Sequence, residues 1–180
     1  MKKNIGTALT LYPTPTVVIG AMVNGKPTWT LVAHIGIMGH DHVTVSLAQA
    51  HYINQGIKDY GVLSINVVDE SWLGAADQMG CVSGNKEDKS GAFSYTMGEQ
   101  GAPMIDNAKL SIECRVEVNH ETTGFDNFIC TIEGTYAEES ILDKNRKVDY
   151  HVFKPVLFEM PTYEYFRTGD VIGNCMQIEK

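Results

Sequence analysis

The feature that most constrains this chain is a series of short hydrophobic segments with the composition of β-strands, the first two of which are joined by Asn24-Gly25. Residues 16–23 precede this dipeptide and residues 26–33 follow it. Asn-Gly favours a two-residue hairpin turn, because both central residues of such a turn need positive φ. Pro27 cannot donate a ladder hydrogen bond, so the sequence predicts a hairpin with its second strand at a sheet edge.

Further strands are predicted along most of the chain. Residues 42–47 alternate between polar and apolar side chains, which is typical of a strand with one buried face. The remaining predicted strands are residues 62–68, 110–119, 127–138 and 150–158. Residues 80–91 are polar and contain glycine, so they predict a loop, and residues 168–180 show no clear pattern.

Only two short helices interrupt this series of strands. The first is predicted over residues 48–60, where Ile53 and Ile57 share one face and Gly61 is suited to end the helix. The second is predicted to run to Met79, after a cap by Asp69 or Ser71. Because strands and helices do not alternate regularly, the pattern favours a closed or partly closed antiparallel barrel over a Rossmann sheet.

Length and charge exclude several classes of protein. The 180 residues suit one domain, which we assign to residues 1–180, and the net charge of −8 argues against binding to nucleic acid. No apolar run approaches the roughly 20 residues that cross a bilayer. The first residues lack the apolar core of a signal peptide, and we expect a cytoplasmic protein. Its cysteines have no zinc-site spacing and are expected to be reduced: Cys81, Cys114, Cys130 and Cys175.

Three segments could contact a ligand, although no P-loop, dinucleotide-binding or hydrolase motif is present. Residues 28–34 contain Trp29, which either stacks on a ligand or packs in the barrel. Residues 46–57 run from a strand into a helix, whose first amides suit a phosphate. There, His51 is either a phosphate ligand or a surface residue. Residues 81–90 carry hydroxyls and lysines, and form either a lid over an anion or a solvated turn begun by Asp88.

The order of short motifs resembles the flavin reductase-like proteins of the flavoredoxin type. The first motif is His-Tyr-x-Asn-x-Gly-Ile at residues 51–57, followed by Ser-Ile-Asn at 64–66 and Cys-x-x-Ser-Gly-x-x-x-Asp-Lys-Ser at residues 81, 83, 84 and 88–90. The resemblance continues in residues 102–105, 113–114, 153–158 and 169–173. It therefore spans about residues 10–178, which is nearly the whole chain.

This resemblance implies a split β-barrel with a few short helices, a homodimer and non-covalent FMN near the subunit interface. Residues 28–34 are expected along the isoalloxazine ring and residues 46–54 at the ribityl chain and phosphate, with residues 83–90 approaching the same pocket. The start of the helix near Ala50 would form a positive patch with His51 and Lys89. The expected cofactor-binding residues are Thr28, Trp29, Thr30, Val32, Ala33, His34, Ser46, Leu47, Ala48, Ala50, His51, Tyr52, Asn54, Cys81, Ser83, Lys89 and Ser90.

Two departures from the family pattern affect the predicted pocket. The family commonly has Thr or Ser where this chain has Ile53, and that hydroxyl usually serves the phosphate. Its loss removes a hydrogen bond worth about 0.5–1.5 kcal/mol. Residues 35–42 lack the usual small-residue and proline pattern, and contain two glycines and two histidines instead. Retention of FMN is expected to weaken unless backbone amides, His51, Asn54 and Lys89 compensate. The second departure would alter either the ring pocket or the access of a redox partner.

The leading functional hypothesis is an FMN-dependent oxidoreductase without a catalytic acid–base pair, because flavin itself carries the redox chemistry. Its electrons come either from NAD(P)H or from a redox protein, as in a flavin reductase or an electron carrier. The alternatives are a flavin-binding protein without turnover and a split barrel that has lost flavin. Cys81 is either a redox-active thiol or only small and buried. No metal site is expected.

Overall fold

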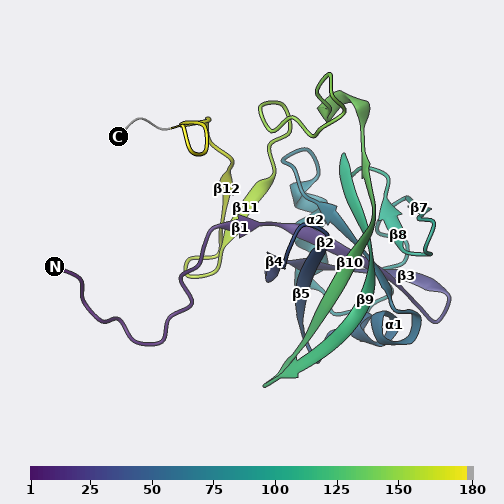
Figure 1. The fold of residues 1–180 in the computed structure, drawn as a ribbon. Coiled ribbons are helices and arrows are strands. Elements are labelled where there is room, and N and C mark those ends of the chain that lie inside the picture. Colours follow the sequence, from purple (N-terminus) through teal and green to yellow (C-terminus); the bar gives the residue numbers. More distant parts are fainter. Residues whose placement is uncertain (178–180) are drawn as a thin grey trace.

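The computed structural model describes residues 1–177 of the chain, which form a curled antiparallel sheet flanked by two helices (Figure 1). The last residues of the predicted tail, 178–180, lie outside the described residues. The seven-stranded sheet has the order β3-β2-β6-β9-β10-β5-β4. Its strands are β2 (Val17–Val23), β3 (Lys26–Val32), β4 (Ile35–Ile37), β5 (His42–Ala48), β6 (Val62–Val67), β9 (Leu110–Thr122) and β10 (Phe125–Ala137). The predicted split β-barrel is confirmed.

The predicted hairpin is confirmed in detail. Asn24 and Gly25 join β2 to β3 and both have positive φ, at 50° and 78°. Met22 pairs with Pro27, and β3 is the outermost strand at one end of the sheet. The Pro27 nitrogen therefore removes no hydrogen bond from the interior of the sheet.

The first helix is shorter than predicted. Helix α1 spans Ile53–Tyr60, and the prediction that it begins near Ala48 or Ala50 is wrong. Ala48 is still the last residue of β5, paired with Phe125, and the Gln49 amide donates to the Gly124 carbonyl at 3.0 Å. Because residues 48 and 49 are still bonded to residues 124 and 125, the helix begins only at Ile53. Ile53 and Ile57 are buried, and Gly61 ends the helix with φ of 68°, both as predicted.

The second helix, α2 (Leu73–Cys81), begins later than predicted and has no side-chain cap. The Asp69 carboxylate instead accepts the Ser71 amide at 2.8 Å and the Lys109 ammonium at 2.9 Å. These bonds hold the segment before the helix, and α2 extends two residues beyond Met79, to Cys81.

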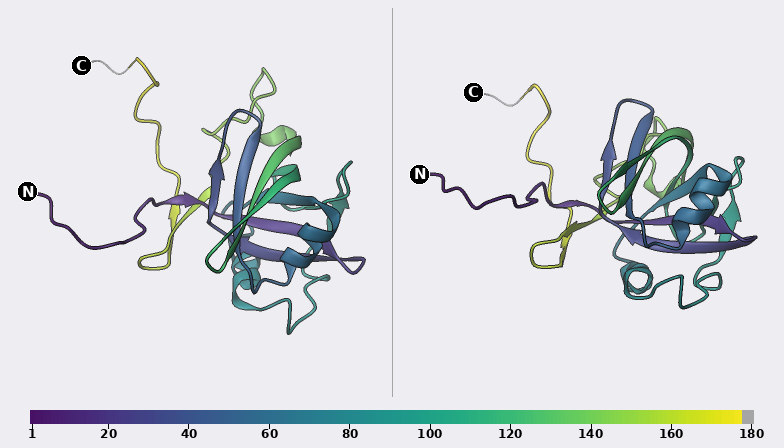
Figure 2. Two further views of the ribbon diagram at one scale, coloured as in Figure 1. Left: turned by 60° about the horizontal axis from the view of Figure 1, so that its bottom comes forward. Right: turned by 90° about the horizontal axis from the view of Figure 1, so that it is seen from below.

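Two smaller sheets complete the fold. The first consists of β1 (Thr14–Pro15), β11 (Val156–Glu159) and β12 (Glu164–Arg167), and the second of β7 (Tyr95–Met97) and β8 (Pro103–Ile105). A 3-10 turn, η1 (Glu139–Ile141), follows β10. The predicted strand over residues 150–158 is wrong in its first half, because residues 150–152 form a turn and β11 begins only at Val156. Both terminal segments extend away from the barrel on the side of β1 and β12 (Figures 1 and 2).

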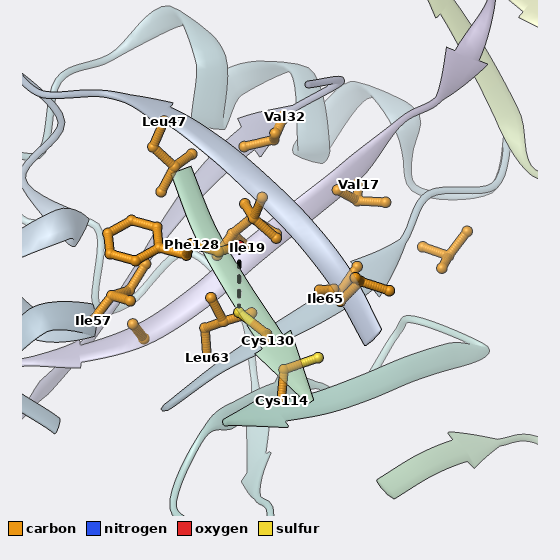
Figure 3. Close-up of a cluster of buried hydrophobic side chains, with 14 of the residues drawn as sticks. Val17, Ile19, Val32, Leu47, Ile57, Leu63, Ile65, Cys114, Phe128 and Cys130 are labelled. Carbon is orange, nitrogen blue, oxygen red and sulfur yellow. Dashed lines mark hydrogen bonds between the residues drawn. The ribbon is translucent and has the colours of Figure 1, made fainter. Parts of the chain in front are cut away.

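The core lies inside the curled sheet, with α1 over one end (Figure 3). Along β2 the side chains alternate, so that Val17 and Ile19 face this core and Val18 faces a second cluster against α2. Cys114 and Cys130 are buried in the core as free thiols, as expected. Burial raises the pKa of Cys130 to about 12, so this thiol stays protonated.

Candidate functional site

Two adjoining cavities lie where β3, the end of β5, the start of α1 and the end of α2 meet. The first, called here the polar cavity, has a volume of about 340 Å³ and lies between β3, the residues before α1 and the loop after α2. The second, called the aromatic cavity, has about 430 Å³ and lies between β3, β5 and the β11–β12 hairpin. The residues that line both are Leu31, Ala48, His51, Gly80 and Cys81. The two cavities therefore form one continuous cleft.

Most of the residues predicted from sequence line this cleft. Those in the polar cavity are Thr28, Trp29, Thr30, Ala48, Ala50, His51, Tyr52, Cys81, Ser83 and Lys89. Those that line the aromatic cavity are Val32, Ala33, His34, Ser46 and Leu47, together with Ala48, His51 and Cys81. Asn54 and Ser90 line neither cavity. Three segments far apart in the sequence thus meet at one place.

Lys89 is fixed in the wall of the polar cavity. Its side chain is buried, and its ammonium donates hydrogen bonds to the carbonyl oxygens of Trp29 at 3.1 Å and Met79 at 2.8 Å. Burial lowers the pKa of this amine, while the charge of Glu87 opposes the shift. Lys89 therefore joins β3 to the last turn of α2 and presents one remaining N–H.

His51 lies at the junction of the two cavities. The residue is exposed, and its Nδ1 is 3.2 Å from the Thr30 hydroxyl. The protein around the ring removes enough water to lower the pKa of His51, and the nearby charge of Lys89 lowers it further. At neutral pH the imidazole is therefore uncharged and offers either a donor or an acceptor nitrogen, depending on its tautomer.

Asn54 holds the fold together behind the cleft. Its amide nitrogen donates to the carboxylate of Asp126 at 2.8 Å and to the carbonyl oxygen of Ala48 at 3.1 Å. Lys58 also pairs with Asp126, at 2.9 Å. Asn54 is 3% exposed, and its amide nitrogen is committed to this network, whereas its Oδ1 has no hydrogen-bond partner within residues 1–177. The motif at residues 51–57 therefore places His51 in the cleft and Asn54 behind it.

The loop after α2 contains the Asp88 turn expected from sequence, while its role as a lid over an anion stays a prediction. Ser83 and Gly84 line the polar cavity, whereas Asp88 begins a turn by accepting the Ser90 amide at 2.9 Å. The Asp88 carboxylate also pairs with Lys26 at 2.8 Å, and this hydrogen bond holds the pKa of Asp88 well below its usual value. The loop is thus tied to the start of β3.

Trp29 and Cys81 both line the cleft, but Trp29 is buried and Cys81 is exposed. The Trp29 indole is 1% exposed and packs edge-on against Phe93, with ring centroids 5.6 Å apart. The structure therefore favours its interpretation as a barrel residue, and its carbonyl oxygen is the group that Lys89 contacts. Cys81 is exposed at the end of α2, with Sγ 3.8 Å from a carboxylate oxygen of Asp77, so its interpretation as a small buried residue is wrong.

The aromatic cavity contains residues that sequence reasoning missed. They are Thr16, Asp77, Phe125, Phe158, Met160, Tyr163 and Tyr165. Four of them come from the β11–β12 hairpin, where Tyr165 donates to Asp77 at 2.6 Å. A concentration of aromatic residues at 158–166 was the available signal. The Thr16 hydroxyl is buried and has no hydrogen-bond partner within residues 1–177.

His34 is also held in the aromatic cavity by an aromatic neighbour. Its Nε2 is 3.2 Å from the Tyr12 hydroxyl, and its ring lies edge-on to Phe125 at a centroid distance of 5.9 Å. These contacts fix the imidazole at the end of β3, beside a largely apolar wall. The cleft thus offers a polar end and an aromatic end.

Comparisons with known proteins agree with this architecture. The family model described as "Flavin reductase like domain" matches residues 9–163. The chain belongs to the flavin reductase-like family. This family assignment supports a redox function that depends on a bound flavin. No curated protein matches the chain.

Two solved structures of flavoredoxins are similar over nearly their full length. Flavoredoxin from Methanosarcina acetivorans is 32% identical, with a TM-score of 0.94 over 98% of this chain and 96% of that one. Flavoredoxin of Desulfovibrio vulgaris (Miyazaki F) is 27% identical, with a TM-score of 0.90 over 98% of each chain. An FMN-binding protein from Thermus thermophilus, 17% identical with a TM-score of 0.82 over 97% of this chain and 100% of that one, shares the fold.

Proposed function

We propose that this chain binds FMN non-covalently in the cleft and transfers electrons through it, either as a flavin reductase or as a flavoredoxin-type carrier. The observation that supports this most is the continuity of a polar and an aromatic cavity along β3. FMN has the same two parts, a flat ring system and a polar ribityl phosphate. Membership of the flavin reductase-like family and the likeness to two flavoredoxins point to the same cofactor.

The residues present fit this cofactor. The aromatic cavity has the volume and the apolar walls that a ring system requires, and the buried Thr16 hydroxyl beside it lacks a partner. An unpaired buried hydroxyl is costly, so a ring carbonyl or nitrogen that engages it would remove that cost. In the polar cavity, the hydroxyls of Thr28, Thr30 and Ser83 suit a ribityl chain.

Bound FMN supplies the redox chemistry, accepting two electrons from a hydride donor or passing them on singly. The chain itself positions and shields the cofactor. Lys89 fixes β3 against α2 and leaves one N–H at the cavity, while neutral His51 joins the two ends of the cleft. The β11–β12 hairpin forms one wall of the aromatic cavity and would shield one side of the ring from water. None of these roles requires a catalytic acid–base pair.

The electron donor is either NAD(P)H or a redox protein, and one experiment separates these modes. The absorption spectrum of the purified chain with FMN is recorded before and after anaerobic addition of NADH or NADPH. Bleaching of the flavin band at a steady rate supports a reductase. Bound flavin that only a reduced redox protein bleaches supports a carrier. Coloured protein that neither donor reduces supports a binding protein without turnover, and colourless protein without FMN affinity removes the proposal.

A homodimer in the cytoplasm is the proposed state of the protein. Both terminal segments are extended, and they carry exposed apolar side chains such as Leu11 at 85% and Ile172 at 97%. Exposed apolar segments of this kind favour burial against a second copy. Within residues 1–177, no helix is both apolar enough and long enough to cross a bilayer. The net charge of −8 supports the absence of a nucleic-acid partner.

A further inference from the structure

The turn between β11 and β12 is held in place by its own side chains. Glu159 pairs with Glu164 across this hairpin, so residues 160–163 form the turn. The Glu159 carboxylate accepts the Thr162 amide at 2.8 Å, and the Thr162 hydroxyl donates to the Glu164 carboxylate at 2.5 Å. These bonds fix the conformation of the turn, and its last residue, Tyr163, lines the aromatic cavity.

Tyr163 has a backbone conformation that does not suit a tyrosine. Its φ is 58°, which lies in the left-handed region. A Cβ crowds the main chain in this region, so glycine occupies it freely, and asparagine is enriched there because its short polar side chain bonds to the nearby main chain. An aromatic ring makes no such local bond. The geometry of the turn therefore does not account for a tyrosine at this position.

Packing within the chain does not account for Tyr163 either. The residue is 74% exposed although it lines the aromatic cavity. Its ring meets Phe158 edge-on, with centroids 6.2 Å apart, and Phe158 packs in turn against Tyr165 at 5.5 Å. Phe158 and Tyr165 are both partly buried. Tyr163 is thus the most exposed member of this aromatic series and lies at the mouth of the cavity.

The opposite wall of the aromatic cavity belongs to the barrel. It includes the apolar side chains of Val32, Leu47 and Phe125. The β11–β12 hairpin stands beside the barrel (Figure 1), and about 430 Å³ of open volume lies between the two. A planar ring system in this volume would contact apolar barrel residues on one side and the aromatic residues of the hairpin on the other.

We infer that Tyr163 is a flavin-binding residue, whose ring closes the open side of the aromatic cavity over the ring system of FMN. This inference rests on the proposed function, because it concerns the same cleft. Aromatic rings attract one another beyond the effect of the area that they bury, so contact with the flavin would stabilise the complex. A residue that strains the fold and strengthens binding is typical of a functional site.

Substitution of Tyr163 by asparagine separates binding from folding. Asparagine tolerates the left-handed conformation, so Tyr163→Asn should keep or raise the urea midpoint of unfolding. The same change should weaken FMN binding by about tenfold, because an aromatic contact is lost. Isothermal titration of the full chain, freed of flavin by dialysis, measures this effect. Tyr163→Phe keeps the ring and should bind FMN less than about threefold more weakly than the wild type.

Arg146→Asn is the matched control. Arg146 also has a left-handed φ, of 60°, and it is exposed in a turn that lines neither cavity. Its replacement by asparagine should keep or raise the unfolding midpoint, as at Tyr163, and leave FMN affinity unchanged. The opposite effects on stability and affinity should therefore occur only at Tyr163.

Three results would overturn the inference and leave the proposed function intact. Equal FMN affinity of Tyr163→Asn and the wild type would show that the ring does not contact the cofactor. A lower unfolding midpoint together with weaker binding would show that Tyr163 only supports the hairpin. A different oligomeric state of Tyr163→Asn in sedimentation velocity would place the residue in an interface between copies. If the wild type does not bind FMN, the proposed function itself fails and the inference fails with it.

Discussion

The ammonium of Lys89 lies 3.1 Å from the carbonyl oxygen of Trp29 and donates a hydrogen bond to it from across the cleft wall. A second bond, to Met79, joins the same ammonium to α2. Lys89 lies ten residues after Met79 and 60 residues after Trp29, so this one side chain closes a long loop onto an edge strand. The shape of the polar cavity therefore depends on it.

Replacing Lys89 by methionine should lower both stability and flavin affinity. The apolar chain keeps its volume, but two buried carbonyl oxygens lose their donor, at a cost of about 1–3 kcal/mol in unfolding free energy. Flavin binding should weaken as β3 and α2 separate, by about tenfold or more. Urea unfolding and titration with FMN measure the two effects. Lys86→Met, on the exposed part of the same loop, is the control and should change neither. Unchanged stability of Lys89→Met would show that the two carbonyls do not depend on the lysine.

The pH dependence of FMN binding should differ from the dependence expected if His51 had the pKa of an ordinary histidine. If His51 had its usual pKa of 6.5, affinity for a phosphate would fall as pH rises through that value. Because burial and Lys89 lower its pKa, the imidazole loses its proton at a lower pH than an ordinary histidine. We expect His51 to leave FMN affinity constant from about pH 7 to 8, and any change from His51 to appear at lower pH. A decline centred between these values would contradict the lowered pKa.

The same shift predicts a loss of stability in mild acid. The unfolded chain protonates His51 at about its ordinary pKa of 6.5, whereas the folded chain does so only at a lower pH. The unfolded state thus binds more protons in this window, so this contribution to stability falls as pH drops from 6.5 to the lowered value. His51→Gln should remove that part of the acid sensitivity, as measured by urea unfolding at several pH values. Parallel curves for both proteins would contradict it.

Local signals in the sequence predicted local structure well. The Asn24-Gly25 turn and the cap at Gly61 depend on backbone conformations that these residues favour, and both occur as expected. The start of α1 was wrong because Ala48 pairs with Phe125, which lies 77 positions later in the chain. No pattern within residues 48–60 carries that information. The family resemblance supplied the segments of the cleft, and pairing between distant strands determined their final boundaries.

The aromatic end of the cleft was missed for a similar reason. Phe158 pairs with Thr14 in the β1–β11 ladder, which brings the chain's end beside its beginning. The turn at residues 150–152 interrupts what the sequence presents as one strand. Asn54 is the opposite case, a residue that was predicted at the site but does not line it. Its place in the motif at residues 51–57 led us to expect it at the phosphate. Its amide is instead committed to Asp126.

Asn54→Ala should therefore reduce stability and leave flavin binding unchanged. Burial alone would raise the pKa of the Asp126 carboxylate, but hydrogen bonds from Lys58, Asn119 and Asn54 together hold it below its usual value. Removing the Asn54 donor should cost about 1–3 kcal/mol of unfolding free energy. Gln55→Ala, at the exposed neighbouring position, is the control for helix effects. Loss of FMN affinity in Asn54→Ala, measured well below its unfolding midpoint, would restore Asn54 to the binding site.

The packing of α1 on β2 should depend on the absence of a side chain at Gly56. A Cβ at this position would overlap the main-chain carbonyl group of Met22 and crowd the Val23 side chain. Backbone cannot move away cheaply, so Gly56→Ala should destabilise the chain by about 1–3 kcal/mol or more. Gly74→Ala in α2 is the matched control, since nothing lies within 4 Å of its added Cβ. This control should be neutral or stabilise by about 0.5–1 kcal/mol. Thermal unfolding of both variants compares them directly.

Dimerisation should depend on the extended terminal segments. Leu9 and Leu11 are 60% and 85% exposed, and both border a depression that contains His34 and Phe125 beside the cleft. A second copy that covers this region would bury apolar surface next to the flavin site. Sedimentation velocity at micromolar concentration should show a dimer for the full chain, and Leu11→Asp should shift it towards monomer while weakening FMN binding. Tyr60→Asp, an exposed change at the end of α1, should leave the dimer intact. A full chain that sediments as a monomer, with or without FMN, would place the whole site within one subunit.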